Sequence, residues 1–226
     1  MKRADLAKTQ EDRLFNYNQA IEQDPKREEA YLKRGNLHLA LRQYLMAIQD
    51  FSQVLRNDAK KIEALIGRGN GYIALKQFMP ALKDYDKIIA LDSKNVTALT
   101  IRGEIYTQIG NFEQALKDLN EAVRLNDQFF IAYNNRGKVF MLQKEYKKAI
   151  SEYDKTLELS PKYTKAFFNR ANTYYHLMCS DWKEACLLKD ETACSNFVRA
   201  ACYQLKFKQI DERSPLSTPI LPQMTQ

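Results

Sequence analysis

Few residues in this sequence could act in acid–base or nucleophilic chemistry. The 226 residues include only two histidines, His38 and His176, to serve as general bases for a Ser, Cys or Thr nucleophile. His38 stands where related segments of the chain have Tyr or Phe, so we expect it to pack rather than react. No P-loop, GxGxxG, HExxH or EF-hand pattern is present. We therefore predict no enzyme activity, no catalytic residue and no cofactor.

All four cysteines lie near the C-terminal end, at Cys179, Cys186, Cys194 and Cys202. A disulfide between Cys186 and Cys194 could close a short hairpin. The alternative is that all four are small buried thiols in packed helices, which we favour for a chain without an export signal. No close C-x2-C pair exists and only His176 lies nearby, so we predict no metal site.

Charged residues recur in two columns with a period of 34 residues. The arginines are Arg34, Arg68, Arg102, Arg136 and Arg170. The acidic residues are Asp50, Asp84, Asp118 and Glu152. An arginine ladder could bind anions, but the matching acidic column favours structural pairs between helices, each contributing about 0 to 1 kcal/mol if exposed.

Apolar and small residues keep the same period. Behind each arginine come Gly35, Gly69, Gly103, Gly137 and Ala171, then rings or His at His38, Tyr72, Tyr106, Phe140 and Tyr174. The second half of each unit has Tyr44, Phe78, Phe112 and Tyr146, then Ala47, Ala81, Ala115 and Ala149. Spacings of three and four place these residues on one helical stripe, so each unit is predicted to be a helical hairpin.

This pattern resembles the tetratricopeptide repeat, which implies an all-α fold: a right-handed superhelical solenoid of helix-turn-helix hairpins. The resemblance gives full units at 28–61, 62–95, 96–129 and 130–163, and a fifth first helix from Thr164. Residues 1–27 form a half repeat, because Tyr17, Ala20 and Pro25 match the end of a second helix.

The C-terminal region departs from the period. Trp182 and Ala185 look like the aromatic and the alanine of a second helix displaced by two residues, and the segment resembles Sel1-like repeats and the terminal hairpins of bacterial tetratricopeptide proteins. We expect residues 164–208 to form an atypical fifth repeat with a capping helix near 192–207. The Pro-containing residues 209–226 are predicted to be disordered.

Composition and charge exclude some functions. The net charge is +7, but basic and acidic residues are interleaved, which is typical of solvated helix faces and makes a nucleic-acid partner improbable. No segment has the 18 or so apolar residues that a membrane span needs. We predict a cytoplasmic location, with export left open if a signal peptide was removed.

The resemblance implies a peptide-binding groove lined by the first helices. Its predicted residues are Leu32, Asn36, Ile66, Asn70, Thr100, Glu104, Asn134, Asn135, Lys138, Lys165, Asn169 and Asn172. Asparagine amides donate and accept hydrogen bonds together, so they can hold a peptide backbone. The predicted function is a protein-interaction scaffold that binds a peptide segment of a partner. The alternative is a self-associating scaffold, in which a terminal repeat completes the stack of a second copy.

Overall fold

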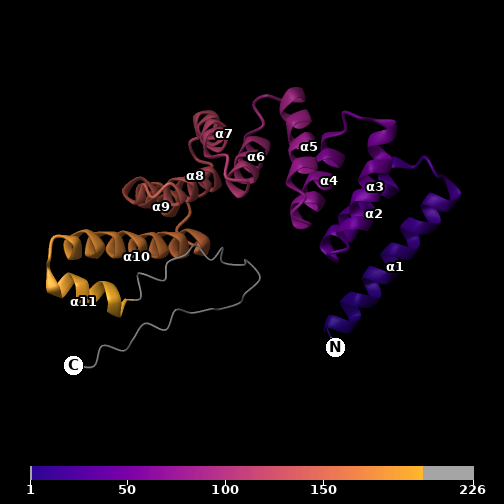
Figure 1. The fold of residues 1–226 in the computed structure, drawn as a ribbon. Helices are drawn as coiled ribbons and strands as arrows, with labels where there is room; N and C mark the ends of the chain where they lie inside the picture. Colours follow the sequence, from indigo (N-terminus) through magenta and orange to yellow (C-terminus); the bar gives the residue numbers. More distant parts are fainter. Residues whose placement is uncertain (1, 201–226) are drawn as a thin grey trace. The chain divides into compact units, whose positions relative to one another are not determined.

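The computed structural model describes residues 2–200, with side chains described from Thr9 onward (Figure 1). This part of the chain forms eleven α-helices and no strand, so the all-α prediction is confirmed. The helices are α1 Lys2–Gln23, α2 Glu28–Ala40, α3 Tyr44–Asn57, α4 Ile62–Ala74, α5 Phe78–Leu91, α6 Val96–Gln108, α7 Phe112–Leu125, α8 Phe130–Leu142, α9 Tyr146–Leu159, α10 Thr164–Leu187 and α11 Glu191–Arg199. None of the helices described is long and apolar enough to cross a bilayer.

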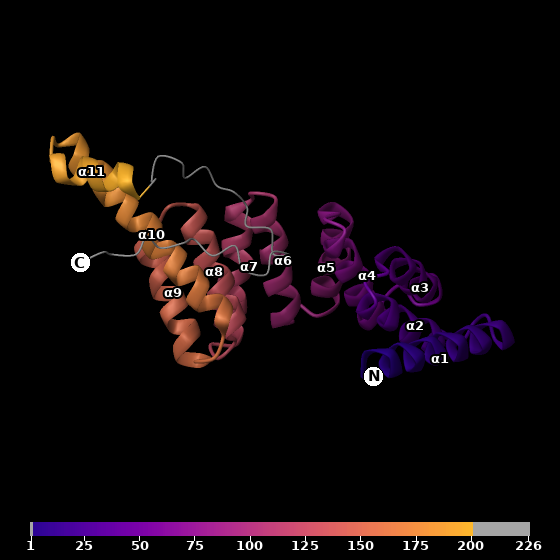
Figure 2. The same cartoon turned by 90° about the horizontal axis from the view of Figure 1, so that it is seen from below.

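The chain divides into two compact units, Met1–Thr173 and Tyr174–Gln226, with the boundary inside α10. In the first unit, α2 to α9 follow one another in chain order as four hairpins (Figures 1 and 2). The first helices α2, α4, α6 and α8 have 13 residues each, and the second helices α3, α5, α7 and α9 have 14. Each first helix begins at the first residue of a predicted unit.

Left-handed residues end the first helices. Arg42, Lys76, Gly110 and Lys144 have φ values of 60°, 58°, 80° and 64°. In the turn between α2 and α3, the N–H of Gln43, which follows the left-handed residue Arg42, donates to the carbonyl of His38 at 2.8 Å. This bond satisfies a carbonyl group that the helix end would otherwise leave free, and the chain then turns into the second helix.

Aromatic side chains of the second helices pack against glycines of the first helices. Phe51, Tyr85 and Tyr153 are 0% exposed, and their rings lie against Gly35, Gly69 and Gly137 respectively. The aromatic and small columns of the sequence therefore meet inside each hairpin, where the absence of a side chain on one helix admits a ring from the other.

The fifth first helix does not turn where the other four do. The 34-residue period predicts a left-handed residue at Met178, but α10 continues to Leu187 and the positive φ, 68°, occurs at Lys189. The prediction that Trp182 and Ala185 belong to a second helix is wrong, because both lie within α10. Residue identity alone does not account for this difference, because Arg42, Lys76 and Lys144 adopt the left-handed conformation although their helix propensities are close to that of methionine.

The second unit contains the end of α10 and the short helix α11. The side chain of Asp190 accepts a hydrogen bond from the Ala193 N–H at 2.8 Å and so begins α11. The predicted capping helix thus starts at Glu191. Its expected part beyond Ala200 lies outside the described residues, as does the predicted disordered segment 209–226.

A disulfide joins the two helices of the second unit. Cys186 and Cys194 are bonded, with their Cα atoms 4.5 Å apart, so the structure contains the disulfide alternative and not two reduced thiols at these positions. The Tyr175 hydroxyl donates to the Ala200 carbonyl at 2.5 Å. α11 therefore runs back along α10. Cys202 lies outside the described residues.

Candidate functional site

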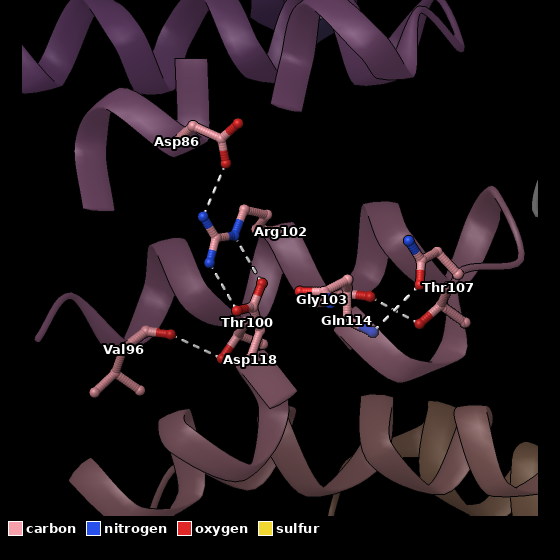
Figure 3. A network of polar contacts seen from close by, with 9 residues as sticks. Asp86, Val96, Thr100, Arg102, Gly103, Thr107, Gln114 and Asp118 are labelled. Carbon is pink, nitrogen blue, oxygen red and sulfur yellow. Dashed lines mark hydrogen bonds and ion pairs between the residues drawn. The ribbon is translucent and has the colours of Figure 1, made fainter. Parts of the chain in front are cut away.

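Each repeat is held by an arginine that forks between two neighbouring second helices. In Figure 3, Arg102 of α6 donates through Nε and Nη2 to both carboxylate oxygens of Asp118 on α7, at 2.7 and 2.8 Å. Its Nη1 reaches Asp86 on α5 at 2.8 Å. The paired carboxylate raises the pKa of Arg102, so the guanidinium stays charged.

The same fork occurs in the other full repeats, which confirms the predicted pairing of the two charged columns. Arg34, Arg68 and Arg136 bond both oxygens of Asp50, Asp84 and Glu152 at 2.6 to 3.0 Å. These are not exposed pairs, because the side chain of Asp84 is 2% exposed. Burial raises the pKa of Glu152 above its ordinary value, and the pairing with Arg136 offsets only part of this effect. The first four arginines of the column are thus paired with carboxylates, which argues against an anion-binding ladder.

His38 also has a structural environment. It is 9% exposed, and its Nδ1 lies 2.6 Å from Gln43 Oε1 inside the first hairpin. Within the described residues, no group of three or more His, Cys, Asp or Glu side chains could hold a metal ion.

Four predicted groove residues are buried: Leu32, Thr100, Asn134 and Asn135. Leu32 is 7% exposed and belongs to the hydrophobic core, and Thr100 is 2% exposed. The Thr100 hydroxyl donates to the Val96 carbonyl of its own helix at 2.8 Å (Figure 3). Neither Leu32 nor Thr100 offers a polar group or a surface to a partner, so we leave both out of the candidate site. Their prediction rested on unit position alone, which does not say how closely the neighbouring helices approach.

Other predicted residues are accessible but partly engaged. Asn36, Asn70 and Lys165 are exposed, while Ile66, Glu104, Lys138, Asn169 and Asn172 are half-buried. Asn36 donates to Glu63 at 3.4 Å, and Asn70 accepts from the Tyr85 hydroxyl at 2.7 Å. Burial raises the pKa of Tyr85, so this hydroxyl remains a donor. In the first two repeats the asparagines therefore also support the fold.

Three predicted asparagines form a chain of amides on α8 and α10. Asn169 Nδ2 donates to Asn134 Oδ1 at 3.0 Å, and Asn134 Nδ2 donates to Asn135 Oδ1 at 3.3 Å. Asn135 is 8% exposed, and its Nδ2 has no acceptor within the described part of the chain. The structure thus brings Asn169 next to two asparagines of the preceding repeat, and the Nδ2 of Asn135 is a buried donor without an acceptor among the described residues. We call this group the asparagine cluster.

Comparison with known sequences identifies the repeats. Sequence models described as tetratricopeptide repeat match residues 28–61 and 130–163, and one described as TPR repeat matches residues 103–144. The chain is a tetratricopeptide repeat protein. No curated protein sequence matches it. The Sel1-like resemblance of the C-terminal region is not among the matches and stays a prediction.

Solved structures share the tetratricopeptide fold. The MamA protein is 26% identical, with a TM-score of 0.58 over 76% of this chain and 89% of that one. YrrB, a TPR protein with an unusual peptide-binding site, is 21% identical, with a TM-score of 0.56 over 84% of this chain and 93% of that one. A thermophilic TPR protein of Thermus thermophilus is 17% identical, with a TM-score of 0.60 over 71% of this chain and 88% of that one.

A shallow pocket of this tetratricopeptide array lies away from the predicted groove. Its lining residues are Ser52, Leu55, Arg56, Ala59, Arg68 and Lys87, none of which we predicted as a binding residue. Arg68 is already bonded to Asp84 and Ser52, so the pocket's cations are partly neutralised. We therefore place the candidate site at the asparagine cluster.

Proposed function

We propose that this tetratricopeptide repeat protein is a non-enzymatic scaffold that binds an extended peptide segment of a partner protein at the asparagine cluster. A protein-interaction role for the array as a whole is supported by the family match. The similar fold of YrrB, which has a peptide-binding site, agrees with this role.

The unpaired Nδ2 of Asn135 carries the proposal. A buried donor without an acceptor costs about 1 to 3 kcal/mol. Because this nitrogen has almost no exposed surface, a peptide carbonyl would reach it only after the cluster rearranges, and the new bond would then regain that free energy. At the other end of the cluster, the amide oxygen of Asn169 can accept a peptide N–H. One donor and one acceptor suit an extended backbone, whatever side chains it carries.

Residues beside the cluster would contact the side chains of the peptide. Phe168 is 51% exposed and offers an apolar contact, and Lys165 is exposed. Lys138 and Asn172 are half-buried. Several weak contacts of this kind would set the specificity, with the backbone bonds providing affinity.

The test is affinity capture from the native host with quantitative mass spectrometry, followed by peptide arrays of each captured protein. The baits are the wild-type chain, an Asn135→Leu/Asn169→Ala variant and a matched control, Lys83→Ala/Lys117→Ala, which changes exposed residues of second helices. Asn135→Leu keeps the branching at Cγ but removes the amide.

We expect wild type and control to capture the same partner and to bind one short peptide from it. At about 0.5 to 1.5 kcal/mol per hydrogen bond, the groove variant should bind that peptide about tenfold more weakly or worse. Circular dichroism must show that the variant is folded. A folded variant that binds as tightly as wild type would place the site elsewhere.

A further inference from the structure

The first part of α10 has a face that is covered in every other first helix. In the first four repeats a second helix covers this face, and the residues equivalent to Phe167 in three of them, Leu65, Leu99 and Tyr133, are 0%, 4% and 9% exposed. Phe167 itself is 47% exposed. Ala171, equivalent to the buried glycines, is also exposed. The face is open because α10 continues where a turn into a second helix would be expected.

Arg170 on the same face has only part of the usual fork. Its Nη1 donates to Asp154 of the preceding repeat at 2.5 Å. The carboxylate of its own repeat would stand sixteen residues later, as Asp84 does after Arg68, but that position holds Cys186. The carboxylate that receives Nε and Nη2 in the other repeats is therefore missing from this one.

We propose that Phe167, Arg170 and Ala171, the α10 face, dock an amphipathic helix of a partner protein. The chain itself defines the chemistry of that helix, because equivalent faces are covered four times by one pattern. Each covering helix has an alanine, an acidic residue three positions later and a large apolar or aromatic residue next: Ala47, Asp50 and Phe51; Ala81, Asp84 and Tyr85; Ala115, Asp118 and Leu119; Ala149, Glu152 and Tyr153.

Each part of the pattern matches one feature of the α10 face. The carboxylate would fill the vacant side of the Arg170 guanidinium with two parallel hydrogen bonds, as Asp118 does for Arg102. The aromatic residue would cover Ala171, as Tyr85 covers Gly69. The alanine would allow the two helices to approach closely.

A second copy of this chain fits the face less well. The unpaired helix of the repeat array is α1, and its residues at the alanine and acidic positions are Arg13 and Asn16. An arginine there would bring a like charge toward Arg170 and fill the space of the alanine. Charge complementarity therefore favours a partner with an acidic helix over self-association through α1.

The probe is a fluorescent, hydrocarbon-stapled peptide with the α5 sequence, residues 78–91, because an unstapled helix of this length is marginally stable in water. It is titrated into the full chain by fluorescence anisotropy. The protein variants are Arg170→Glu and Phe167→Ala, each checked for wild-type helicity by circular dichroism. The matched control is Lys183→Glu, an exposed charge reversal on the same helix.

We expect Arg170→Glu and Phe167→Ala each to weaken binding about tenfold or more, and Lys183→Glu to change it less than threefold. A peptide with Asp84→Lys should bind wild type poorly and regain affinity for the Arg170→Glu protein. Such a reciprocal rescue shows that the two residues pair directly, because a modest loss of protein stability could not by itself restore affinity. Equal binding of the original peptide by wild type and by folded Arg170→Glu protein would overturn the proposal.

Hydroxyl-radical footprinting of Phe167 distinguishes a partner helix from two other possible occupants of the α10 face, residues 201–226 and a second copy of the chain. We expect strong labelling of the free monomeric chain and protection by the peptide. Protection in the monomer alone would assign the face to residues 201–226 and overturn the proposal. Protection that appears only as the mass rises in analytical ultracentrifugation would assign the face to a second copy, with the same consequence.

Discussion

The ring of Phe51 lies directly against the backbone of Gly67 in the following repeat. A Cβ atom added at Gly67 would stand 2.3 Å from Phe51 Cζ, closer than any real contact of this kind. Phe51 is 0% exposed and fills the space between the first two repeats, so its ring cannot move aside without opening the core. The second repeat is thus seated on the first partly through Gly67, which has no side chain.

Gly67→Ala should therefore destabilise the protein, even though alanine favours helices by about 1 kcal/mol over glycine. Overpacking of this kind costs about 1 to 3 kcal/mol net, measurable by urea denaturation followed by circular dichroism. In a Phe51→Leu protein, Gly67→Ala should cost less unfolding free energy than it does in the wild type, because the smaller side chain leaves room for the added methyl group. A stabilised Gly67→Ala protein would show that the ring is free to shift.

Asp84→Ala should cost about 2 to 4 kcal/mol of unfolding free energy. It leaves the Arg68 guanidinium, 19% exposed in the structure, without its two buried hydrogen bonds. Asp86→Ala on the same helix is the comparison, because Asp86 is 52% exposed and makes a single bond to Arg102. Its cost should be about 1 kcal/mol or less. Equal costs for the two variants would contradict the assigned role of the buried fork.

Lys76→Gly should stabilise the array by about 1 kcal/mol. Lys76 has φ 58°, a left-handed conformation that costs an L residue about 1 to 2 kcal/mol and glycine little. The reverse change at the equivalent position of the third repeat, Gly110→Lys, should destabilise by a similar amount, since Gly110 has φ 80° and open space around it. Opposite shifts in thermal midpoint are the expected pair of results.

The disulfide should stabilise the second unit alone. Removing a cross-link that closes a loop of this size costs about 2 to 3 kcal/mol. The measurement is hydrogen exchange of α11 in a Cys186→Ala/Cys194→Ala variant, which should rise while exchange in α2 to α9 stays constant. Faster exchange throughout the four repeats would mean that the cross-link also supports the array.

Acidification should loosen the packing of His176. Burial lowers its pKa below the ordinary value of 6.5, so the unfolded segment binds a proton more readily than the folded one. The stability contribution is complete above pH 6.5 and is lost as the pH falls through the folded pKa. Exchange of the α10 amides near residue 176 should rise as the pH falls below 6.5, and His176→Gln should remove that pH dependence.

Much of the fold could be predicted because glycine, ring and arginine recur with one period. The 34-residue spacing predicted the first four hairpins and the pairing of Arg102 with Asp118. It failed at α10, where the absence of a left-handed residue at Met178 matters more than the aromatic and alanine signals at Trp182 and Ala185.

The candidate site was less predictable. Unit position located Asn134, Asn135 and Asn169, but it did not reveal that their amides form one chain ending in an unpaired donor. It also placed Leu32 and Thr100 on a surface that the packing removes. One signal for the open α10 face is present in the sequence, since Cys186 stands where the acidic column would have its fifth carboxylate.

The bonds that each column arginine makes to the preceding repeat differ in type along the array. Arg102 reaches the preceding repeat through the carboxylate of Asp86, whereas Arg68 reaches it through the neutral hydroxyl of Ser52 at 3.3 Å. Both boundaries lie within one apolar core, and the second also has an ion pair where the first has a neutral hydrogen bond. The stability of a linear array depends on the contacts between neighbouring repeats, so added salt should weaken the second boundary slightly more than the first. The salt concentration is thus expected to change where along the array unfolding begins.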